Sequence, residues 1–139
     1  MKLEYKIDSK QKLLIEVITG TFNFSQLKKL LTHISSDKQF SDFDKVLTNL
    51  TNAHFKISLF EIDSYLKFIK EIVKDKEVKW ALLTSKPKAT ALAMLISFDS
   101  SFKKSTKIFS TLEGCTNFLE VSINENEFSK DDFISVDFS

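Results

Sequence analysis

Apolar and polar positions are arranged along the chain in patterns that predict strands and helices in turn. Leu3–Ile7 alternates between apolar and polar residues, and Leu13–Ile18 is rich in β-branched residues. Asp8–Lys10 between them has the composition of a tight turn. We therefore predict an amino-terminal β-hairpin, followed by a bend that Gly20 permits.

A first helix is predicted directly after the hairpin. Asn23 and Gln26 have the spacing of a capping pair, in which each side chain bonds the other residue's backbone amide. The apolar positions that follow recur at the spacing of one helix face: Phe24, Leu27, Leu30, Leu31 and Ile34.

The longest strand candidate, Lys45–Phe55, ends in polar residues and leads into a second helix. Ser58 and Glu61 form a capping box at the start of that helix. Its apolar stripe consists of Ile62, Tyr65, Leu66, Ile69, Ile72 and Val73. Four lysines lie off the stripe, and we expect them to form a solvated face: Lys67, Lys70, Lys74 and Lys76.

The same order of elements then repeats. Val78–Thr84 is a buried strand candidate, and Ser85–Pro87 has the composition of a helix start. The helix that follows is apolar on nearly every side over Ala89–Phe98. Lys107–Phe109 is a short last strand.

A last helix is predicted to begin at a third capping pair, Ser110 and Glu113. Its apolar positions are Leu112, Cys115, Phe118 and Leu119. The predicted order is therefore ββαβαβαβα, and the fold class is α/β, because the later strands are far enough apart for helical crossovers. We expect a mixed sheet, mostly parallel with an antiparallel edge strand, and helices packed on the sheet.

Length and charge suggest how the chain is divided. Its 139 residues, 42% of them hydrophobic, suit one compact domain. Residues 1–121 carry 19 lysines and 14 acidic residues, whereas residues 122–139 carry one lysine and five acidic residues. We therefore expect a single domain over 1–121 and an acidic carboxyl-terminal extension over 122–139.

The extension permits three interpretations. Apolar residues alternate at Ile134, Val136 and Phe138, as in an added strand. A helix near Phe128 and disorder are the two alternatives, and the sequence does not choose between the three.

Composition argues against several classes of function. All 20 basic residues are lysines and the net charge is +1, so the arginine fork that suits sequence-specific nucleic-acid recognition is missing. The longest apolar run, Ala89–Phe98, is roughly half the length of a membrane span. A single cysteine and an amino terminus without a secretory signal favour a cytoplasmic protein.

The chain shows no clear catalytic, metal-binding or cofactor-binding motif. His33 and His54 are far apart, and with the lone Cys115 they lack the spacing of metal ligands. Cys115 falls on the apolar stripe of its helix, where a cysteine is usually a small buried hydrophobe. We expect no enzyme activity, no metal and no cofactor.

Several stretches of the chain, taken in order, resemble the SpoIIAA-like (STAS/SEC14-like) family. They are Leu3–Asp8, Val46–Phe55, Val78–Thr84 with the small-residue helix after it, and Lys107–Phe109 followed by Leu112 and Glu113. The resemblance covers residues 3–121. It implies the STAS fold of the anti-sigma-factor antagonists, in a small bacterial protein that acts by binding and not by catalysis.

The resemblance also implies a candidate phosphoacceptor. In the anti-sigma-factor antagonists the strand-to-helix turn carries Asp-Ser-Ser-Gly, and Ser58 falls at the position of the phosphorylated serine. Ile57 replaces the aspartate, and Leu59 and Phe60 replace the second serine and the glycine. The alternative role of Ser58 is that of a helix N-cap, worth about 1 kcal/mol.

Polar residues follow two neighbouring predicted strands, and the carboxyl ends of parallel strands meet at one edge of a sheet. They are Thr51, Asn52 and His54 after one strand, and Thr84, Ser85 and Lys86 after the other. A helix start and a lysine at this edge would suit an anion or a small polar ligand. The alternative is ordinary turn and cap chemistry.

The helix over Ala89–Phe98 is the candidate interaction face, because a helix that is apolar all round is either buried or covered by a partner. Its candidate contact residues are Leu92, Met94, Leu95 and Phe98. Lysines flank it, with a net charge of +4 over residues 86–107. We predict that the acidic extension lies over this basic patch.

We therefore expect a binding or regulatory module that acts on a protein partner or by self-association. The alternative is a binder of a small apolar or anionic ligand, such as a lipid, as the SEC14-like part of the resemblance implies.

Overall fold

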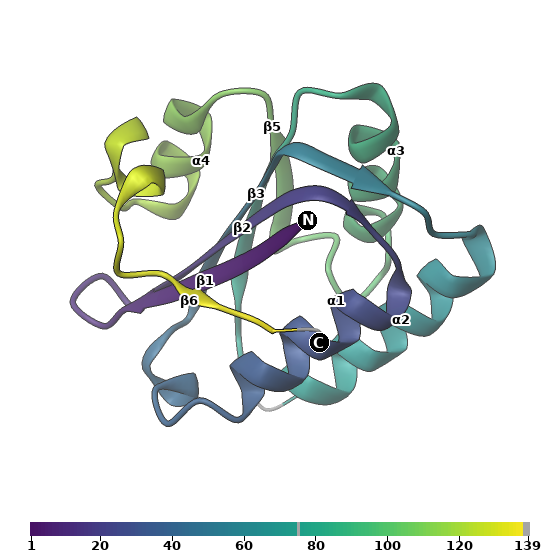
Figure 1. Ribbon diagram of the computed structural model, residues 1–139, viewed down its shortest axis with the longest axis horizontal. Helices are drawn as coiled ribbons and strands as arrows, with labels where there is room; N and C mark the ends of the chain where they lie inside the picture. Colours follow the sequence, from purple (N-terminus) through teal and green to yellow (C-terminus); the bar gives the residue numbers. More distant parts are fainter. Residues whose placement is uncertain (75, 138–139) are drawn as a thin grey trace.

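The computed structural model describes residues 1–74 and 76–137. They form a six-stranded sheet in the order β5-β4-β3-β2-β1-β6 (Figure 1). The strands are β1 (Lys2–Asp8), β2 (Leu13–Phe22), β3 (Lys45–Phe55), β4 (Lys79–Leu83), β5 (Thr106–Phe109) and β6 (Ile134–Ser135). The helices are α1 (Phe24–Ser35), α2 (Leu59–Val73), α3 (Pro87–Ser97) and α4 (Leu112–Leu119), with two 3-10 helices, η1 (Phe40–Asp42) and η2 (Glu125–Ser129).

The pairing of the strands confirms the predicted fold class. β1 and β2 form the antiparallel hairpin, with Leu3 opposite Ile18 and Ile7 opposite Leu14. β2, β3, β4 and β5 then run parallel to one another. The parallel arrangement follows from the connections, because β3, β4 and β5 are each reached from the strand before them through a segment that contains a helix.

Helices cover the two faces of the sheet unequally (Figure 1). α1, α2 and α3 lie over one face, and their buried residues form a large core with alternate residues of the strands. α4 lies over the other face, where Cys115 and Leu119 pack against Leu47 and Ala81. The period of two along a strand divides β3 between the layers: Leu47 faces α4, and Val46 belongs to the larger core.

Capping boxes fix the starts of α1 and α2, as predicted. The Asn23 side chain accepts a hydrogen bond from the Gln26 amide, and the Gln26 side chain accepts one from the Asn23 amide. Ser58 and Glu61 make the same reciprocal pair. Each box satisfies two amides that a helix start otherwise leaves unpaired.

The start predicted for the last helix is wrong by one residue. Thr111, not Ser110, is the N-cap, and its Oγ1 accepts a hydrogen bond from the Gly114 amide at 3.1 Å. The strand ladder explains the shift. Because the Phe109 carbonyl still accepts from the Thr84 amide at 3.0 Å, the chain leaves the sheet one residue later than predicted.

The bend predicted at Gly20 after the hairpin is not formed. Gly20 lies inside β2, opposite Ala53. Its φ of 92° is in the region that favours glycine. The register with β3 shifts between Val17 and Thr19, and a Cβ on Gly20 would lie only 2.9 Å from Met1 Cα. The extra residue at this irregularity lies in β3, between Asn49 and Asn52, and β2 continues past Gly20 to its end and leads directly into α1.

The acidic extension joins the sheet beside β1. β6 pairs antiparallel with β1, and the buried Val136 donates its amide to the Leu3 carbonyl at 2.9 Å. η2 surrounds Phe128, so the described part of the extension contains both a short strand and a helical turn. Phe138, the last residue of the alternating pattern, lies outside the described residues.

The contact predicted between the extension and the helix of residues 89–98 is wrong. β6 and β5 lie at opposite edges of the sheet, and α3 contacts β3 and β5. The extension is held instead by Lys6, whose Nζ lies 3.2 Å from Glu127 Oε1 and 3.1 Å from Asp132 Oδ1. Phe128 and Phe133 pack into the core under α4, and this apolar contact fixes its path.

Candidate functional site

The polar residues predicted to gather at the carboxyl edge of the sheet come together only in part. Lys86 Nζ donates to His54 Nε2 over 3.0 Å, which joins β3 to the start of α3. The Thr51 side chain bonds within its own strand: its Oγ1 donates to Asn49 Oδ1 at 2.7 Å. The pairing of β3 with β4 ends at Asn49, so the rest of β3 extends past its neighbour.

The remaining three residues of this set are separated by their burial. Thr84 is buried, and its Oγ1 lies 3.2 Å from Thr90 Oγ1 in the first turn of α3. Asn52 and Ser85 are exposed. The edge therefore presents an exposed lysine–histidine pair and no enclosed cradle, and anion binding at these residues stays a prediction.

The predicted interaction helix is α3, and it buries one side. Leu92 is only 8% exposed and packs in the larger core with Ile96, so it does not belong to an interaction face. The helical period turns it toward the sheet. Met94, Leu95 and Phe98 are 42%, 41% and 66% exposed. Three of the four predicted residues thus form an exposed apolar patch, which we call the α3 patch.

Lysines flank the α3 patch. Lys88 lies in the first turn of α3, and Lys103 and Lys104 lie beyond its carboxyl end; all three are exposed. The single nearby acid, Asp99, is already paired with Lys70 of α2, at 3.0 Å between Oδ2 and Nζ. The surroundings of the patch are therefore positively charged.

Ser58 occupies the N-cap of α2. Its Oγ accepts from the Glu61 amide at 3.2 Å, and the Glu61 side chain accepts from the Ser58 amide at 3.0 Å. Ser58 is exposed, Glu61 is half-buried, and Phe60 beside them is 82% exposed. The structure gives Ser58 a complete role as a cap, and phosphorylation of this residue stays a prediction.

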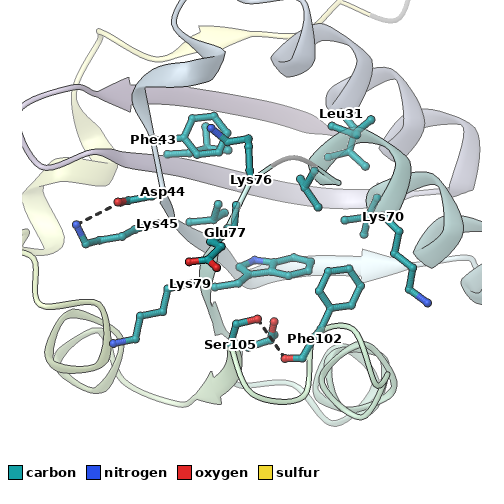
Figure 2. Close-up of a pocket in the computed structure, with 18 of the residues that line it drawn as sticks. Leu31, Phe43, Asp44, Lys45, Lys70, Lys76, Glu77, Lys79, Phe102 and Ser105 are labelled. Atoms are coloured by element: carbon teal, nitrogen blue, oxygen red, sulfur yellow. Dashed lines mark hydrogen bonds and ion pairs between the residues drawn. The ribbon is translucent and has the colours of Figure 1, made fainter.

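A pocket of about 860 Å³ lies at the opposite edge of the sheet, where the parallel strands begin (Figure 2). Leu14, Val46, Trp80 and Thr106 lie side by side on β2 to β5 and form its floor. Its apolar walls come from α2, the η1 region and the loop before β5: Tyr65, Ile69, Ile72, Val73, Phe40, Phe43 and Phe102. The volume is in the range of sites for small molecules.

One buried carboxyl group lies in this mostly apolar pocket. Glu16 of β2 is 6% exposed, and its Oε1 accepts from Thr48 Oγ1 at 2.5 Å. Trp80 Nε1 donates in turn to Thr48 Oγ1 at 2.8 Å. Burial raises the pKa of Glu16 to about 7, although the bond from Thr48 opposes the rise. This carboxyl therefore keeps its proton to a higher pH than an exposed glutamate does.

Three polar groups that line the pocket have no hydrogen-bond partner among the described residues. Thr106 Oγ1 is fully buried and unpaired. Glu16 bonds only through Oε1, which leaves Oε2, and the Tyr65 hydroxyl also makes no hydrogen bond. Burial, and the nearby charge of Glu16, raise the pKa of Tyr65, so its hydroxyl stays protonated. Of the three, Thr106 Oγ1 is shut off from solvent, and leaving such a group unpaired costs free energy.

Lysines surround the opening of the pocket. The charged residues there are Lys45, Lys70, Lys74, Lys76 and Lys79, with Asp44 and Glu77, a net charge of +3. Outside this set, Asp99 pairs with Lys70 and Glu71 pairs with Lys74. Lys76 Nζ bonds the Phe40 carbonyl at 2.9 Å and lies 4.3 Å from the centre of the Phe43 ring. Figure 2 shows Phe43 and Lys76 across the opening from Phe102 and Ser105. Partial burial lowers the pKa of Lys76.

Sequence reasoning missed this pocket, although one signal pointed to it. Glu16 is an acid inside the apolar run Leu13–Ile18, where an alternating strand places it on the buried face. Lys76 and Lys70 were predicted to be a solvated face, yet both line the pocket. The sequence could not show the space between α2 and the sheet, because that space depends on where α2 crosses the strands.

Two other groups of chemically active side chains have structural roles. Tyr5 is buried, and its hydroxyl donates to Asp37 Oδ2 at 2.7 Å and lies 3.1 Å from His33 Nδ1, which ties β1 to the end of α1. Burial of Cys115 raises the pKa of its thiol to about 12, so it is not a thiolate at neutral pH.

The described residues hold no group of three or more side chains placed to bind a metal ion. Within the same part of the chain, every helix is too short or too polar to cross a bilayer.

The sheet order, the hairpin edge and the helices on both faces together define a SpoIIAA-like fold of the STAS type. No family sequence model matches the chain, and no curated protein matches it in sequence. The similarity is to solved structures. It is one of fold, since the sequence identities are low.

Three solved structures illustrate the match. The unphosphorylated anti-sigma factor antagonist SpoIIAA has a TM-score of 0.54 and 9% identity, over 81% of this chain and 91% of that one. The phosphorylated form of the Bacillus cell fate determinant SpoIIAA has a TM-score of 0.51 and 10% identity, over 83% and 96%. An uncharacterised DUF3478-family protein from Shewanella loihica PV-4 has a TM-score of 0.56 and 16% identity, over 86% and 95%.

Proposed function

We propose that the protein is a non-catalytic regulatory module that binds a protein partner through the α3 patch. The fold supports a regulatory role, because two of the structures that share it are of an anti-sigma factor antagonist. The observation that carries the proposal is the exposure of Met94, Leu95 and Phe98 on one turn of a helix whose other side is anchored in the core.

The charge around the patch favours an acidic partner. Lys88, Lys103 and Lys104 are exposed beside it, and the nearby carboxylate of Asp99 is already paired. Self-association through the same patch would bring these lysines toward their copies, and like charges across an interface oppose binding. A partner with an apolar centre and an acidic rim fits the patch better than a second copy of this chain.

The test is a comparison of three versions of the full chain as bait, with captured proteins identified and then purified. Phe98→Glu places a charge in the α3 patch, and we expect it to weaken binding of the purified partner by at least about tenfold. Phe60→Glu makes the same change on α2, at an aromatic residue that is 82% exposed, and is the matched control.

Binding that survives Phe98→Glu but is lost in Phe60→Glu would place the interface on α2 and contradict the proposal. Light scattering on the wild-type chain tests self-association directly. If the wild-type chain forms a dimer that Phe98→Glu disrupts, the α3 patch binds a second copy of the chain and not an acidic partner.

Phosphorylation of Ser58 is a possible control of this module, and the proposal carries it as a prediction. Phosphate would meet the amides at the start of α2, which favour an anion. The Glu61 carboxylate accepts from the Ser58 amide at 3.0 Å, and its negative charge would repel the phosphate. The test is the intact mass of the wild-type chain and of Ser58→Ala, each co-expressed with host kinases. A wild-type chain without added phosphate would contradict the prediction.

A small apolar or anionic ligand is the second candidate function. The specific observation in its favour is the pocket of about 860 Å³ with its three unpaired polar groups and its positively charged opening. Such a pocket, apolar with a few convergent polar groups, has the usual character of a ligand site.

A further inference from the structure

We infer that the pocket at the amino-terminal edge of the sheet binds a single-chain anionic amphiphile with a hydroxyl at its far end, the anion at Lys76 and the hydroxyl at Glu16 and Tyr65. The inference rests on the second candidate function and adds to it the chemistry and direction of the ligand. It concerns residues far from the α3 patch, which belongs to the first proposal.

The apolar body follows from the walls of the pocket. Trp80 forms the middle of the floor, with Phe102 edge-on to it at 6.0 Å between ring centres. Ile69 and Val73 of α2 face it from the wall. A volume of about 860 Å³ accommodates one alkyl or aromatic chain.

The hydroxyl follows from the polar groups deep in the pocket. Thr48 occupies Oε1 of Glu16 and accepts from Trp80, so it has no hydrogen left to donate to a ligand. Glu16 Oε2 and the Tyr65 hydroxyl are the groups available at that end. A hydroxyl both donates and accepts, so it can bond Glu16 in either of its charge states.

The anion follows from the opening. Lys76 forms no ion pair with the described residues; its Nζ bonds the Phe40 carbonyl and lies against two aromatic rings. The net charge of +3 around it favours a negative group. A carboxylate placed there leaves the apolar chain pointing inward, away from solvent.

The experiment uses Trp80, the single tryptophan of the chain, as the reporter, because it lies in the pocket floor. ω-Hydroxydodecanoic acid, dodecanoic acid and dodecanol are titrated into the full chain while indole fluorescence is followed. We expect the hydroxy acid to bind about tenfold more tightly than dodecanoic acid, the value of one buried hydrogen bond. We expect dodecanol to bind most weakly.

Two variants divide the contributions. Glu16→Leu, which replaces the carboxyl group with an apolar side chain of similar size, should remove the preference for the hydroxy acid. Lys76→Gln should weaken both acids by about fivefold and leave dodecanol unchanged. Lys67→Gln is the matched control, since Lys67 is 75% exposed on α2, is absent from the pocket lining and carries the same charge.

The outcomes separate this inference from the function beneath it. Dodecanoic acid and the hydroxy acid binding equally well to the wild type would overturn the inference and leave an apolar-ligand site. Saturable binding of none of the three probes would overturn both. Equal effects of Lys76→Gln and Lys67→Gln would overturn the placement of the anion.

Discussion

The two edges of the parallel sheet differ in almost every physical respect. At the carboxyl edge, His54, Ser58 and Lys86 are bonded to one another or to a helix start, in contact with water. At the amino edge, Glu16 and Thr106 are buried, and Thr106 Oγ1 has no hydrogen-bond partner among the described residues. Local hydrogen bonds satisfy the polar groups of the first edge, whereas at the second edge some polar groups face a pocket. The comparison separates polar residues that complete a fold from polar residues that are available to a ligand.

The largest expected effect is on the pH dependence contributed by Glu16. Its folded pKa of about 7 lies above the ordinary value of 4.5, so the folded chain holds the proton more tightly than the unfolded one. Stability should therefore fall as the pH rises from about 4.5 to about 7, and level off above that. In Glu16→Gln this slope disappears, with a gain at pH 8 on the order of 3 kcal/mol.

The measurement is urea unfolding of both chains from pH 4 to pH 8. Glu125→Gln, at an exposed acid in the extension, is the control and should keep the wild-type slope. A parallel shift of both curves at every pH would mean that Glu16 does not titrate in this range.

A smaller effect is expected from Thr48→Val, which removes the hydroxyl between Trp80 and Glu16. Two buried polar groups then lose their partner, and the free energy of unfolding should fall by about 2 kcal/mol. Thr106→Val is the contrast, because the Thr106 hydroxyl is already unpaired. That variant should be as stable as the wild type or more stable, and equal losses in thermal unfolding of the two would refute the description of the amino edge.

The smallest effect is expected at the carboxyl edge. Ser58→Ala removes the cap of α2 and should cost about 1 kcal/mol, with no dependence on pH between 5 and 8. Ser64→Ala, inside the same helix, is the control and should not destabilise. Chemical unfolding measures both, and a loss at Ser64 as large as that at Ser58 would show that the cap is not the cause.

Much of the fold was predictable because its signals are local. The capping boxes at Asn23 and Ser58 formed as expected, since each depends on residues three apart in the chain. The hairpin and the parallel order followed from strand spacing. The prediction failed where residues distant in the chain determine the local structure. Pairing with β3 keeps Gly20 in a strand. The hydrogen bond from the Thr84 amide to the Phe109 carbonyl extends β5, so the last helix is capped by Thr111 and not by Ser110.

The candidate sites divide in the same way. The sequence left open whether the helix of residues 89–98 is buried or covered by a partner. The exposure of Met94, Leu95 and Phe98 and the burial of Leu92 depend on how α3 is turned against the sheet. The path of the acidic extension was predicted wrongly, because net charge favoured the lysines of residues 86–107. The extension pairs instead with Lys6, a buried lysine of β1 that net charge does not single out.

By itself the sequence determined the elements, their order and their caps, because periodicity and hydrogen bonds within a few residues are written in neighbouring positions. Only the tertiary structure decided that Glu16, Trp80, Lys76 and Thr106 share one pocket. They come from β2, β4, the segment before β4, and β5, and no spacing along the chain encodes their meeting. The physical reason is that burial, and with it the unusual pKa of Glu16, is a property of the packed layers and not of any one segment.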